Sequence, residues 1–369
     1  MKFLSFLLLL QLMLTTPGIA ADPVKIGVIA AKTGDAAATN LVLFEAAQYA
    51  AETLNQQGGL LGHPVELIEY DNNSTALGSR MAAKKAVDDG IIAMIGASWS
   101  SHSIGAASVL QPAGIPLISP ISTSPQVTLE GDYIFRVCYT DPFQGKVMAR
   151  FATQDLKAKT AVVLVNTDRT YSTGLAEFFI QSFEQQGGKI LWKGEFLIDV
   201  SNYEELLQKT KPMNPDIIYL PGDYRDSSQV IGQARKMGIT AIFLGGDAYG
   251  VRMYDYIGNL IDGTYYTTHW HRDAPDTASR TFVGKYETKN GLVKQTTVPL
   301  TYDSVMILAQ AIREAKSLDR KKIRDALAIT QYRGITGLIT FDENRNPVKP
   351  AVILKLEKGD AVYIKTVSP

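Results

Sequence analysis

The feature that most constrains the fold is an alternation of short apolar runs with longer amphipathic stretches, which occurs twice along the chain. The apolar runs are rich in β-branched residues and are bounded by turn-forming residues, as buried strands are. We expect strands at Val24–Ala30, Pro64–Tyr70, Ile91–Ile95, Pro116–Ile118, Ala161–Val165, Ile190–Leu197, Ile217–Leu220 and Ala241–Leu244. Helices are expected between them, among others at Leu41–Gln57, Ala76–Asp88, Thr173–Gln186 and Ser227–Met237. This alternation predicts an α/β fold with parallel, doubly wound sheets.

The two halves of this pattern also resemble each other. A helix ending in Gln-Gln-Gly-Gly at residues 56–59 has a counterpart at residues 185–188, which lies 129 positions later. The segment 91–118 has a partner in the segment 217–244 at an offset of 124 positions, and Gly-Ile precedes the last strand in both. Repeats in the same order predict two similar α/β lobes.

Size and composition agree with two lobes and exclude several protein classes. The chain has 369 residues, whereas single hydrophobic cores rarely grow past roughly 250–300 residues. Lys and Arg together number 37, as do Asp and Glu, so nothing points to a nucleic-acid partner. Cys138 is the single cysteine, which excludes an internal disulfide and a multi-cysteine metal site.

The first twenty residues are typical of a secretory signal peptide. Lys2 precedes an apolar run from Phe3 to Leu14, and Pro17 and small residues follow. The run is shorter than the roughly 20 residues that span a bilayer, which disfavours a membrane anchor. We expect cleavage near Ala20 and an exported, soluble mature protein.

The candidate site lies in the loops that follow four of the predicted strands. In open parallel sheets, ligands bind beyond the carboxyl ends of the strands. The residues of interest there are Trp99, Ser100, Ile121, Ser122 and Thr123 in the first half, and Asp223, Tyr224 and Asp247 in the second. At the offset of 124, Thr123 superposes on Asp247, and Ser100 superposes on Tyr224.

The two sets of loops differ in chemistry. Hydroxyl groups and the N–H groups of a helix start suit a carboxylate, whereas acidic side chains and aromatic rings suit an ammonium group. Facing each other, they would bind a zwitterion. The alternative is that the Ser, Thr and Asp residues are only helix N-caps and turn formers, which is the commoner role for any one of them. Their recurrence at four equivalent strand ends favours a site.

Several short motifs occur in order along the mature chain. They are Val24–Ile29 with Thr33-Gly34, Ile95-Gly96 with Ser100-Ser101, Pro120–Thr123, Tyr171 with Gly174–Ala176, and Gln233–Arg235 with Gly238. From Pro23 to the C-terminus, their order and spacing resemble the periplasmic leucine/isoleucine/valine-binding proteins. These are the type I solute-binding proteins of ABC amino-acid importers.

The resemblance implies roles for individual residues. Ser100, Thr123 and the backbone of Ile121 and its neighbour Ser122 would hold the ligand α-carboxylate, and Asp247 would bind the ammonium group. Tyr171 and Tyr224 would also belong to the site, and Trp99 would stand at its mouth. Two positions depart from the family pattern: Asp247 is one methylene shorter than the usual acid, and Asp223 replaces an expected aromatic residue.

The resemblance further implies a Venus-flytrap architecture with three crossings between the lobes, near Val137–Asp141, Tyr265–Trp270 and Gly337–Asp342. The N-terminal lobe would comprise residues 21–138 and 269–338, and the C-terminal lobe residues 139–268 and 339–369. Such a protein is a periplasmic monomer without cofactor or catalysis. It captures an amino acid, with an aliphatic or branched-chain one favoured, and delivers it to an inner-membrane ABC permease. A receptor for another carboxylate or amino-acid-like solute, or a ligand-sensing subunit, is the alternative.

An enzyme is the rival class, and the motifs do not support one. No Gly-x-Ser-x-Gly elbow surrounds Ser98 or Ser100, and no Gly-x-Gly-x-x-Gly follows the first strand. His102 lies near Ser100 without an acid spaced to complete a triad. His269 and His271 alternate along a strand with no Cys nearby, which favours surface residues over metal ligands.

Overall fold

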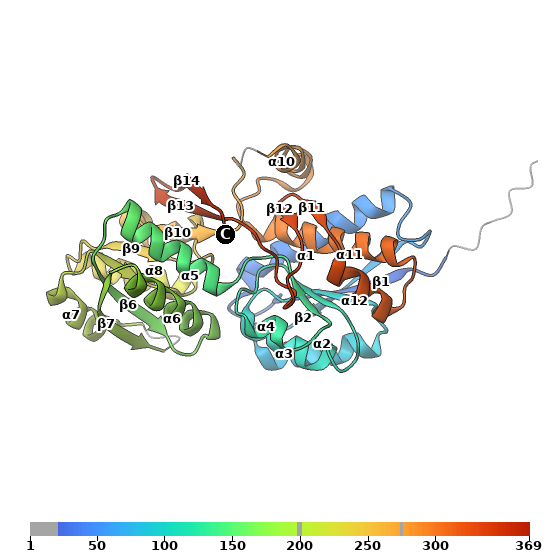
Figure 1. The fold of residues 1–369 in the computed structure, drawn as a ribbon, viewed down its shortest axis with the longest axis horizontal. Coiled ribbons are helices and arrows are strands. Elements are labelled where there is room, and N and C mark those ends of the chain that lie inside the picture. The colour runs from blue at the N-terminus through green and yellow to red at the C-terminus, as the bar shows by residue number, and fades with distance from the viewer. Residues whose placement is uncertain (1–20, 198–200, 274–275) are drawn as a thin grey trace, which may run out of the picture.

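The computed structural model describes residues 21–197, 201–273 and 276–369, and within them the chain forms two α/β lobes side by side (Figure 1). The predicted fold class is confirmed. The predicted signal peptide at residues 1–20 lies outside the described residues. Among the helices of the described part of the chain, none combines the length and apolar character needed to cross a lipid bilayer.

The first lobe contains a five-stranded parallel sheet in the order β2-β1-β3-β4-β5. Its strands are β1 (Val24–Ala30), β2 (Val65–Asp71), β3 (Ala93–Gly96), β4 (Leu117–Ser119) and β5 (Ile134–Arg136). The helices that follow these strands are α1 (Ala37–Gln56), α2 (Ala76–Asp88), α3 (Ser100–Leu110) and α4 (Gln126–Leu129). Later in the chain, α10 (Thr277–Asn290), α11 (Thr297–Ala315), α12 (Arg320–Ile329) and the hairpin β11 (Tyr332–Gly334) and β12 (Gly337–Ile339) complete the lobe.

The second lobe contains a seven-stranded sheet in the order β14-β13-β10-β9-β8-β6-β7. Five strands are parallel to one another: β6 (Thr160–Asn166), β7 (Lys189–Phe196), β8 (Ile217–Tyr219), β9 (Ile242–Gly245) and β10 (Tyr265–Thr268). The antiparallel strands β13 (Ala351–Glu357) and β14 (Asp360–Val367) extend it at one edge. Its helices are α5 (Asp141–Arg150), α6 (Thr170–Gln185), α7 (Glu204–Thr210), α8 (Tyr224–Lys236) and the single turn α9 (Tyr254–Ile257).

The inner parallel strands, such as β1, β3 and β6, are buried on both faces, which explains their continuous apolar sequences, whereas the edge strands β2 and β7 are only partly buried. In β1, Ile26 and Val28 pack with α1 and α11 on one face, whereas Ile29 packs with α2 and α3 on the other. Successive side chains of a strand point to opposite faces of its sheet, so each apolar run serves two helical layers. The second sheet is covered in the same way by two further clusters.

The predicted internal repeat is confirmed element by element. α3 and α8 begin 124 positions apart, at Ser100 and Tyr224, and α1 and α6 end 129 positions apart, at Gln56 and Gln185. The strand order β2-β1-β3-β4-β5 recurs as β7-β6-β8-β9-β10. Because the order is the same, the polar loops after equivalent strands lie at equivalent places in the two lobes.

Three passages of the chain between the lobes are predicted, near Val137–Asp141, Tyr265–Trp270 and Gly337–Asp342. The first passage joins β5 to α5, and the second follows β10. Beyond β12, Phe341 still packs against Phe135 of the first lobe, with ring centroids 5.2 Å apart. Arg345 donates from Nη2 to the carbonyl of Thr128 at 2.8 Å. These contacts favour a third passage just before Ala351, and the lobe boundaries stay predictions.

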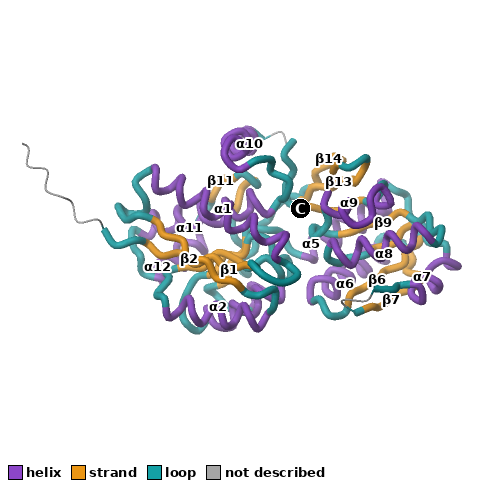
Figure 2. The backbone as a smooth tube through the Cα atoms, turned by 180° about the vertical axis from the view of Figure 1, so that it is seen from behind, coloured by secondary structure: helices purple, strands orange, loops and turns teal. Residues whose placement is uncertain are grey.

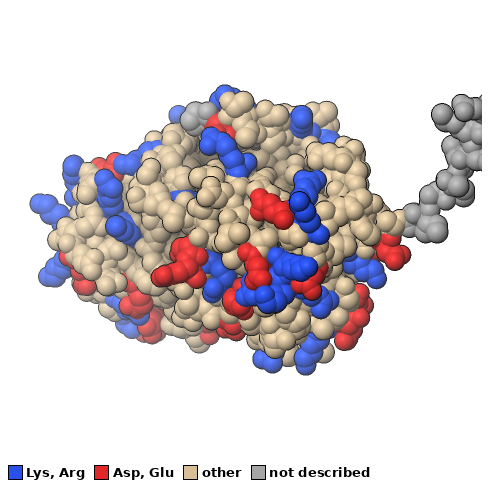
Figure 3. Space-filling model, turned by 45° about the vertical axis from the view of Figure 1, so that its right-hand side comes forward, with Lys and Arg blue, Asp and Glu red and all other residues tan. Residues whose placement is uncertain are grey.

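Helix α10 is an addition on top of the first lobe, as Figures 1 and 2 both show. Its side chains Phe282 and Tyr286 pack with Ala46 of α1 and Val298 of α11. On the face seen in Figure 3, basic and acidic side chains are interspersed, in agreement with a formal net charge of zero.

Candidate functional site

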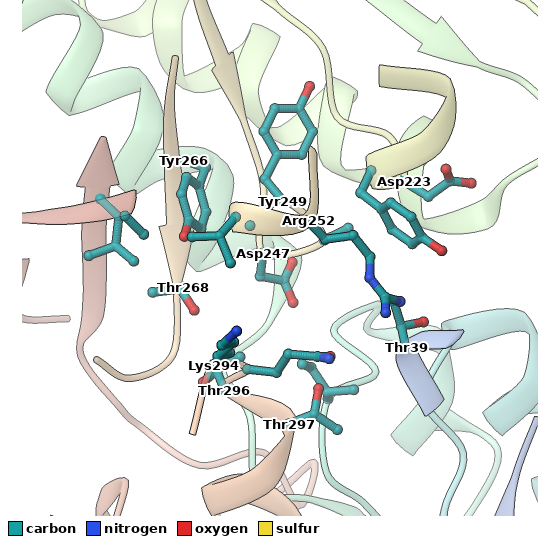
Figure 4. A pocket seen from close by; sticks show the side chains of 18 of the residues that line it. Thr39, Asp223, Asp247, Tyr249, Arg252, Tyr266, Thr268, Lys294, Thr296 and Thr297 are labelled. Atoms are coloured by element: carbon teal, nitrogen blue, oxygen red, sulfur yellow. The ribbon is translucent and has the colours of Figure 1, made fainter. Parts of the chain in front are cut away.

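A cleft of about 860 Å³ lies between the lobes, where the carboxyl ends of the two parallel sheets meet. Its size falls within the roughly 300–1,000 Å³ typical of small-molecule sites. Eight of the nine predicted site residues line it: Trp99, Ser100, Ile121, Thr123, Tyr171, Asp223, Tyr224 and Asp247. Figure 4 shows part of this lining, with Asp247 and Tyr249 from one lobe and Thr39 and Thr297 from the other.

The first-lobe wall is built on the N-terminus of α3 and the loop after β4. Trp99 is the N-cap residue of α3, and Ser100 is its first residue. The Oγ of Ser100 accepts a hydrogen bond of 3.2 Å from the backbone N–H of Ser124, which ties the helix to the β4–α4 loop. A helix N-terminus carries partial positive charge and free N–H groups, so this wall suits an anionic group such as a carboxylate.

Ser122 is the exception among the predicted residues, because it supports this wall from behind. Its Oγ lies 2.7 Å from the Oγ of Ser103 and donates to the carbonyl of Ala97 at 3.3 Å. Its own N–H donates to the Oγ of Ser119 at 3.1 Å. With these groups already bonded within the lobe, Ser122 does not fit the predicted role of contacting a ligand.

Arg136, at the end of β5, also stabilises the loop between β4 and α4. Its buried guanidinium donates to the carbonyl of Ser122 at 2.6 Å and to that of Ser124 at 2.7 Å. Cys138 is also buried there, and its Sγ lies 3.3 Å from the carbonyl of Ser122. Burial raises the pKa of the Cys138 thiol to about 12, so the thiol stays protonated.

Asp247 dominates the second-lobe wall. Its side chain is 5% exposed, and it lies two residues beyond the buried end of β9. The hydroxyl of Tyr171 and the Nε2 amide of Gln144 donate to its Oδ1 at 2.9 and 3.0 Å, and Nε2 of His269 lies 2.9 Å from its Oδ2. A carboxylate held by three donors is fixed in position and keeps further lone pairs for a cation.

The contact with His269 overturns the prediction that this histidine is a surface residue. His269 is buried, and burial lowers the pKa of its imidazole although the charge of Asp247 raises it. The neutral ring must carry its proton on Nε2, because a carboxylate can only accept. The sheet topology explains this contact. Because β10 pairs in parallel with β9, the residue after β10 lies beside the residues after β9.

A second carboxyl group, that of Asp141, lies beneath the cleft at the start of α5. Burial raises the pKa of Asp141 to about 8, the hydroxyl of Thr123 lowers it, and the negative charge of Asp247 raises it. Its backbone N–H donates to the carbonyl of Thr123 at 3.0 Å. Asp141 is therefore mostly neutral at pH 7.

Asp223 is a helix N-cap, which is the alternative role that the sequence leaves open for the acidic residues. Its Oδ1 accepts from the backbone N–H groups of Arg225 and Asp226 at 2.9 and 3.2 Å, so it caps α8. Its Oδ2 lies 4.0 Å from the guanidinium of Arg169. Asp223 lines the cleft, but its charge is already matched within the second lobe.

Within the described residues, His102 is held by contacts with Trp99 and Asn72. Burial lowers the pKa of His102 to about 4, and its ring stacks on Trp99 with centroids 5.1 Å apart. Its Nδ1 lies 3.4 Å from the amide of Asn72. Within the described residues, no group of three or more His, Cys, Asp and Glu side chains is arranged to hold a metal ion.

Comparison with known proteins agrees with this geometry. The family model described as "Periplasmic binding protein" matches residues 23–361. A leucine-, isoleucine-, valine-, threonine- and alanine-binding protein of Pseudomonas aeruginosa is 26% identical over 325 residues, which cover 88% of this chain and 87% of the relative. An amino acid binding protein of the same organism is 33% identical over 231 residues, which cover 62% and 61%.

Solved structures show the same likeness. A leucine-binding protein of Thermotoga maritima superposes with a TM-score of 0.90 at 33% identity, covering 94% of this chain and 99% of that one. A branched-chain amino acid transporter substrate-binding protein of Streptococcus pneumoniae, in complex with isoleucine, superposes with a TM-score of 0.89 at 28% identity, covering 94% and 100%. The chain belongs to the periplasmic binding proteins, in the family of the leucine/isoleucine/valine-binding proteins.

Proposed function

We propose that this protein captures an α-amino acid between its lobes and delivers it to an ABC permease. One observation carries the proposal: a hydroxyl-lined helix N-terminus on one wall faces a fixed carboxylate on the other. The first wall suits an α-carboxylate and the second an α-ammonium group, so only the closed pair of lobes matches a zwitterion. Closure removes water and strengthens both charged contacts.

The roles of the site residues follow from their positions. Ser100, Thr123 and the backbone of Ile121 would hold the α-carboxylate. Asp247 would bind the α-ammonium group, with Tyr171 and Gln144 keeping its carboxylate in place. The names of the relatives make leucine, isoleucine, valine, threonine and alanine the first compounds to test.

Thermal-shift screening against a panel of L-amino acids tests the function directly. A ligand at a hundredfold excess over its dissociation constant stabilises the folded state by about 2.7 kcal/mol, which gives a clear shift. The amine that lacks the carboxylate of the best ligand should produce no shift. A panel in which no amino acid stabilises the protein, or in which the amine is equivalent to the acid, would overturn the proposal.

Asp247→Asn tests the ammonium contact, with Asp223→Asn as the matched control. Asp247→Asn removes the charge that compensates the buried ammonium, and we expect a loss of about 3–5 kcal/mol in binding free energy. Asp223→Asn keeps the helix cap, because Asn caps as well as Asp does, and should change affinity little. Isothermal titration calorimetry of both variants measures these changes in affinity. Should only Asp223→Asn abolish binding, the ammonium group has been placed on the wrong acid.

A further inference from the structure

Four basic side chains line the cleft, and among the described residues two of them have neither a hydrogen-bond partner nor an ion-pair partner. Arg169 lies near Asp223 and over the ring of Trp99, 4.4 Å from its centroid. Arg272 pairs with Glu287 at 3.1 Å. Arg252 and Lys294 make neither a hydrogen bond nor an ion pair with any of the residues that the structure describes. The guanidinium of Arg252 lies 5.9 Å from the centroid of the Tyr224 ring, and Lys294 is exposed. The described part of the cleft therefore contains two positive charges that no carboxylate of the protein pairs with.

Arg252 is the better defined of the two. It lies in the short 3-10 turn Val251–Met253 that follows β9, five residues after Asp247. The side chain is half-buried, and its Nη1 is fully buried with no hydrogen-bond partner. Figure 4 shows its guanidinium reaching from the second lobe toward Thr39 of the first. A buried guanidinium nitrogen without an acceptor is costly, so an acceptor supplied from outside the protein would stabilise it.

The surrounding acids do not supply that acceptor. Asp247 already accepts three hydrogen bonds and faces the ammonium position. Asp255, Asp273 and Asp360 are exposed, at the edge of the cleft, where water solvates them. Lys294, an exposed residue of the opposite lobe just before Thr296 and Thr297, also lines the cleft and adds a second positive charge there.

We propose that the ligand carries a second carboxylate on its side chain, which Arg252 binds with support from Lys294. The inference rests on the proposed function and narrows its ligand to acidic amino acids. A neutral zwitterion would match the hydroxyl wall and Asp247 but would leave Arg252 uncompensated when the lobes exclude water. A carboxylate fits the planar fork of a guanidinium with two parallel hydrogen bonds. This departs from the aliphatic side chain that the family resemblance favours.

The test compares acids with amides of the same shape. Isothermal titration at neutral pH and physiological salt with L-glutamate, L-aspartate, L-glutamine, L-asparagine and L-leucine should show one of the acids binding at least about tenfold more tightly than its amide. A site built for hydrogen bonds to a charged group discriminates strongly against an analogue that lacks the charge. Arg252→Gln should abolish this preference while leaving the affinity for the amide within about threefold.

Two variants control for charge and for folding. Arg272→Gln removes an arginine of the same cleft that already has Glu287 as its partner, and the acid preference should persist. Arg252→Lys keeps the charge and should retain part of the preference. Circular dichroism and the melting temperature of Arg252→Gln show whether this variant is folded. If it is not folded, the affinities of Arg252→Lys and the wild-type ratio of acid to amide affinity test the inference instead.

The outcomes separate the inference from the function on which it rests. If leucine binds and the acids do not, the second carboxylate is overturned and the amino-acid receptor stands. Equal loss of acid and amide binding in Arg252→Gln makes Arg252 a structural support and also overturns the inference. If no amino acid binds the wild-type protein, the proposed function itself fails.

Discussion

At the scale of single residues, the site depends on which buried groups keep their charge. Asp247 is surrounded by donors, whereas Asp141 is buried where the charge of Asp247 opposes its own ionisation. The two carboxyl groups therefore differ in their surroundings: that of Asp247 accepts hydrogen bonds from its neighbours, whereas Asp141 supports the loop that carries Thr123 through its backbone N–H. Sequence shows both acids, but it does not show which is satisfied, because that depends on contacts between segments far apart in the chain.

His102 gives a residue-scale prediction about pH. Its pKa of about 4 in the folded protein lies below the ordinary value near 6.5, so between these values the unfolded chain binds the proton more readily. The free energy of unfolding should therefore fall on acidification through this range, by up to about 3 kcal/mol from this residue. His102→Gln should remove that part of the slope.

Urea unfolding of wild type and variant at several pH values between about 4 and 7 measures the difference. Asp141 and Asp226 have raised pKa values, so they change the free energy of unfolding with pH in the opposite direction. This contribution is the same in wild type and in His102→Gln. Only the difference between the two curves is attributed to His102. Parallel curves would mean that His102 is protonated as easily in the folded state as in the unfolded one.

At the scale of elements, the loop between β4 and α4 depends on a neighbouring strand for its shape. Arg136 of β5 holds two of its carbonyls with separate nitrogens, and a lysine has one nitrogen on a flexible stem. Arg136→Lys should reduce the free energy of unfolding by about 2–4 kcal/mol, because at least one buried bond to a charged group is lost. Ligand affinity should fall as well, because this loop carries Ile121 and Thr123.

Urea denaturation and titration of the same preparation check both effects. Arg150→Lys on α5, where the side chain of an exposed arginine donates to Gln154, is the control and should stay within about 0.5 kcal/mol of wild type. A stable Arg136→Lys protein with unchanged affinity would show that the loop holds its shape without the arginine.

The elements themselves were largely predictable. The predicted Val24–Ala30 and Ala76–Asp88 match the observed strand and helix, because burial on two faces and amphipathic spacing leave clear periodicities. The repeat correctly placed the polar loops at equivalent strand ends. What the repeat could not reveal was the partner of each loop residue: the hydroxyl of Ser122 bonds within its own lobe, and His269, which follows the neighbouring strand β10, contacts Asp247.

At the scale of the whole molecule, the two lobes touch at the mouth of the cleft through charged side chains. Arg225 of α8 donates from Nη2 to the carbonyl of Asp35, in the loop after β1, at 2.9 Å, and its Nη1 lies 3.3 Å from the carboxylate of Asp35. The ring of Trp99 and the guanidinium of Arg169 meet across the cleft in the same way. These contacts exist only while the lobes are together, so they favour the closed form without adding to the stability of either lobe.

The last prediction is that the pair between Asp35 and Arg225 slows ligand release. Both side chains are partly exposed, so we expect a coupling of about 0.2–1 kcal/mol, seen as a dissociation rate a few times faster in Asp35→Asn and Arg225→Gln. The double variant should release ligand no faster than either single one, because the same contact is lost. Stopped-flow displacement of the best-binding amino acid measures these rates, and the effect should fade in about 1 M salt, where the Debye length is near 3 Å. Glu205→Gln is the control, because Glu205 pairs with Lys209 within α7 and never crosses the cleft. If the two single variants add fully in the double one, each side chain acts on the rate separately, and the pair does not hold the lobes together.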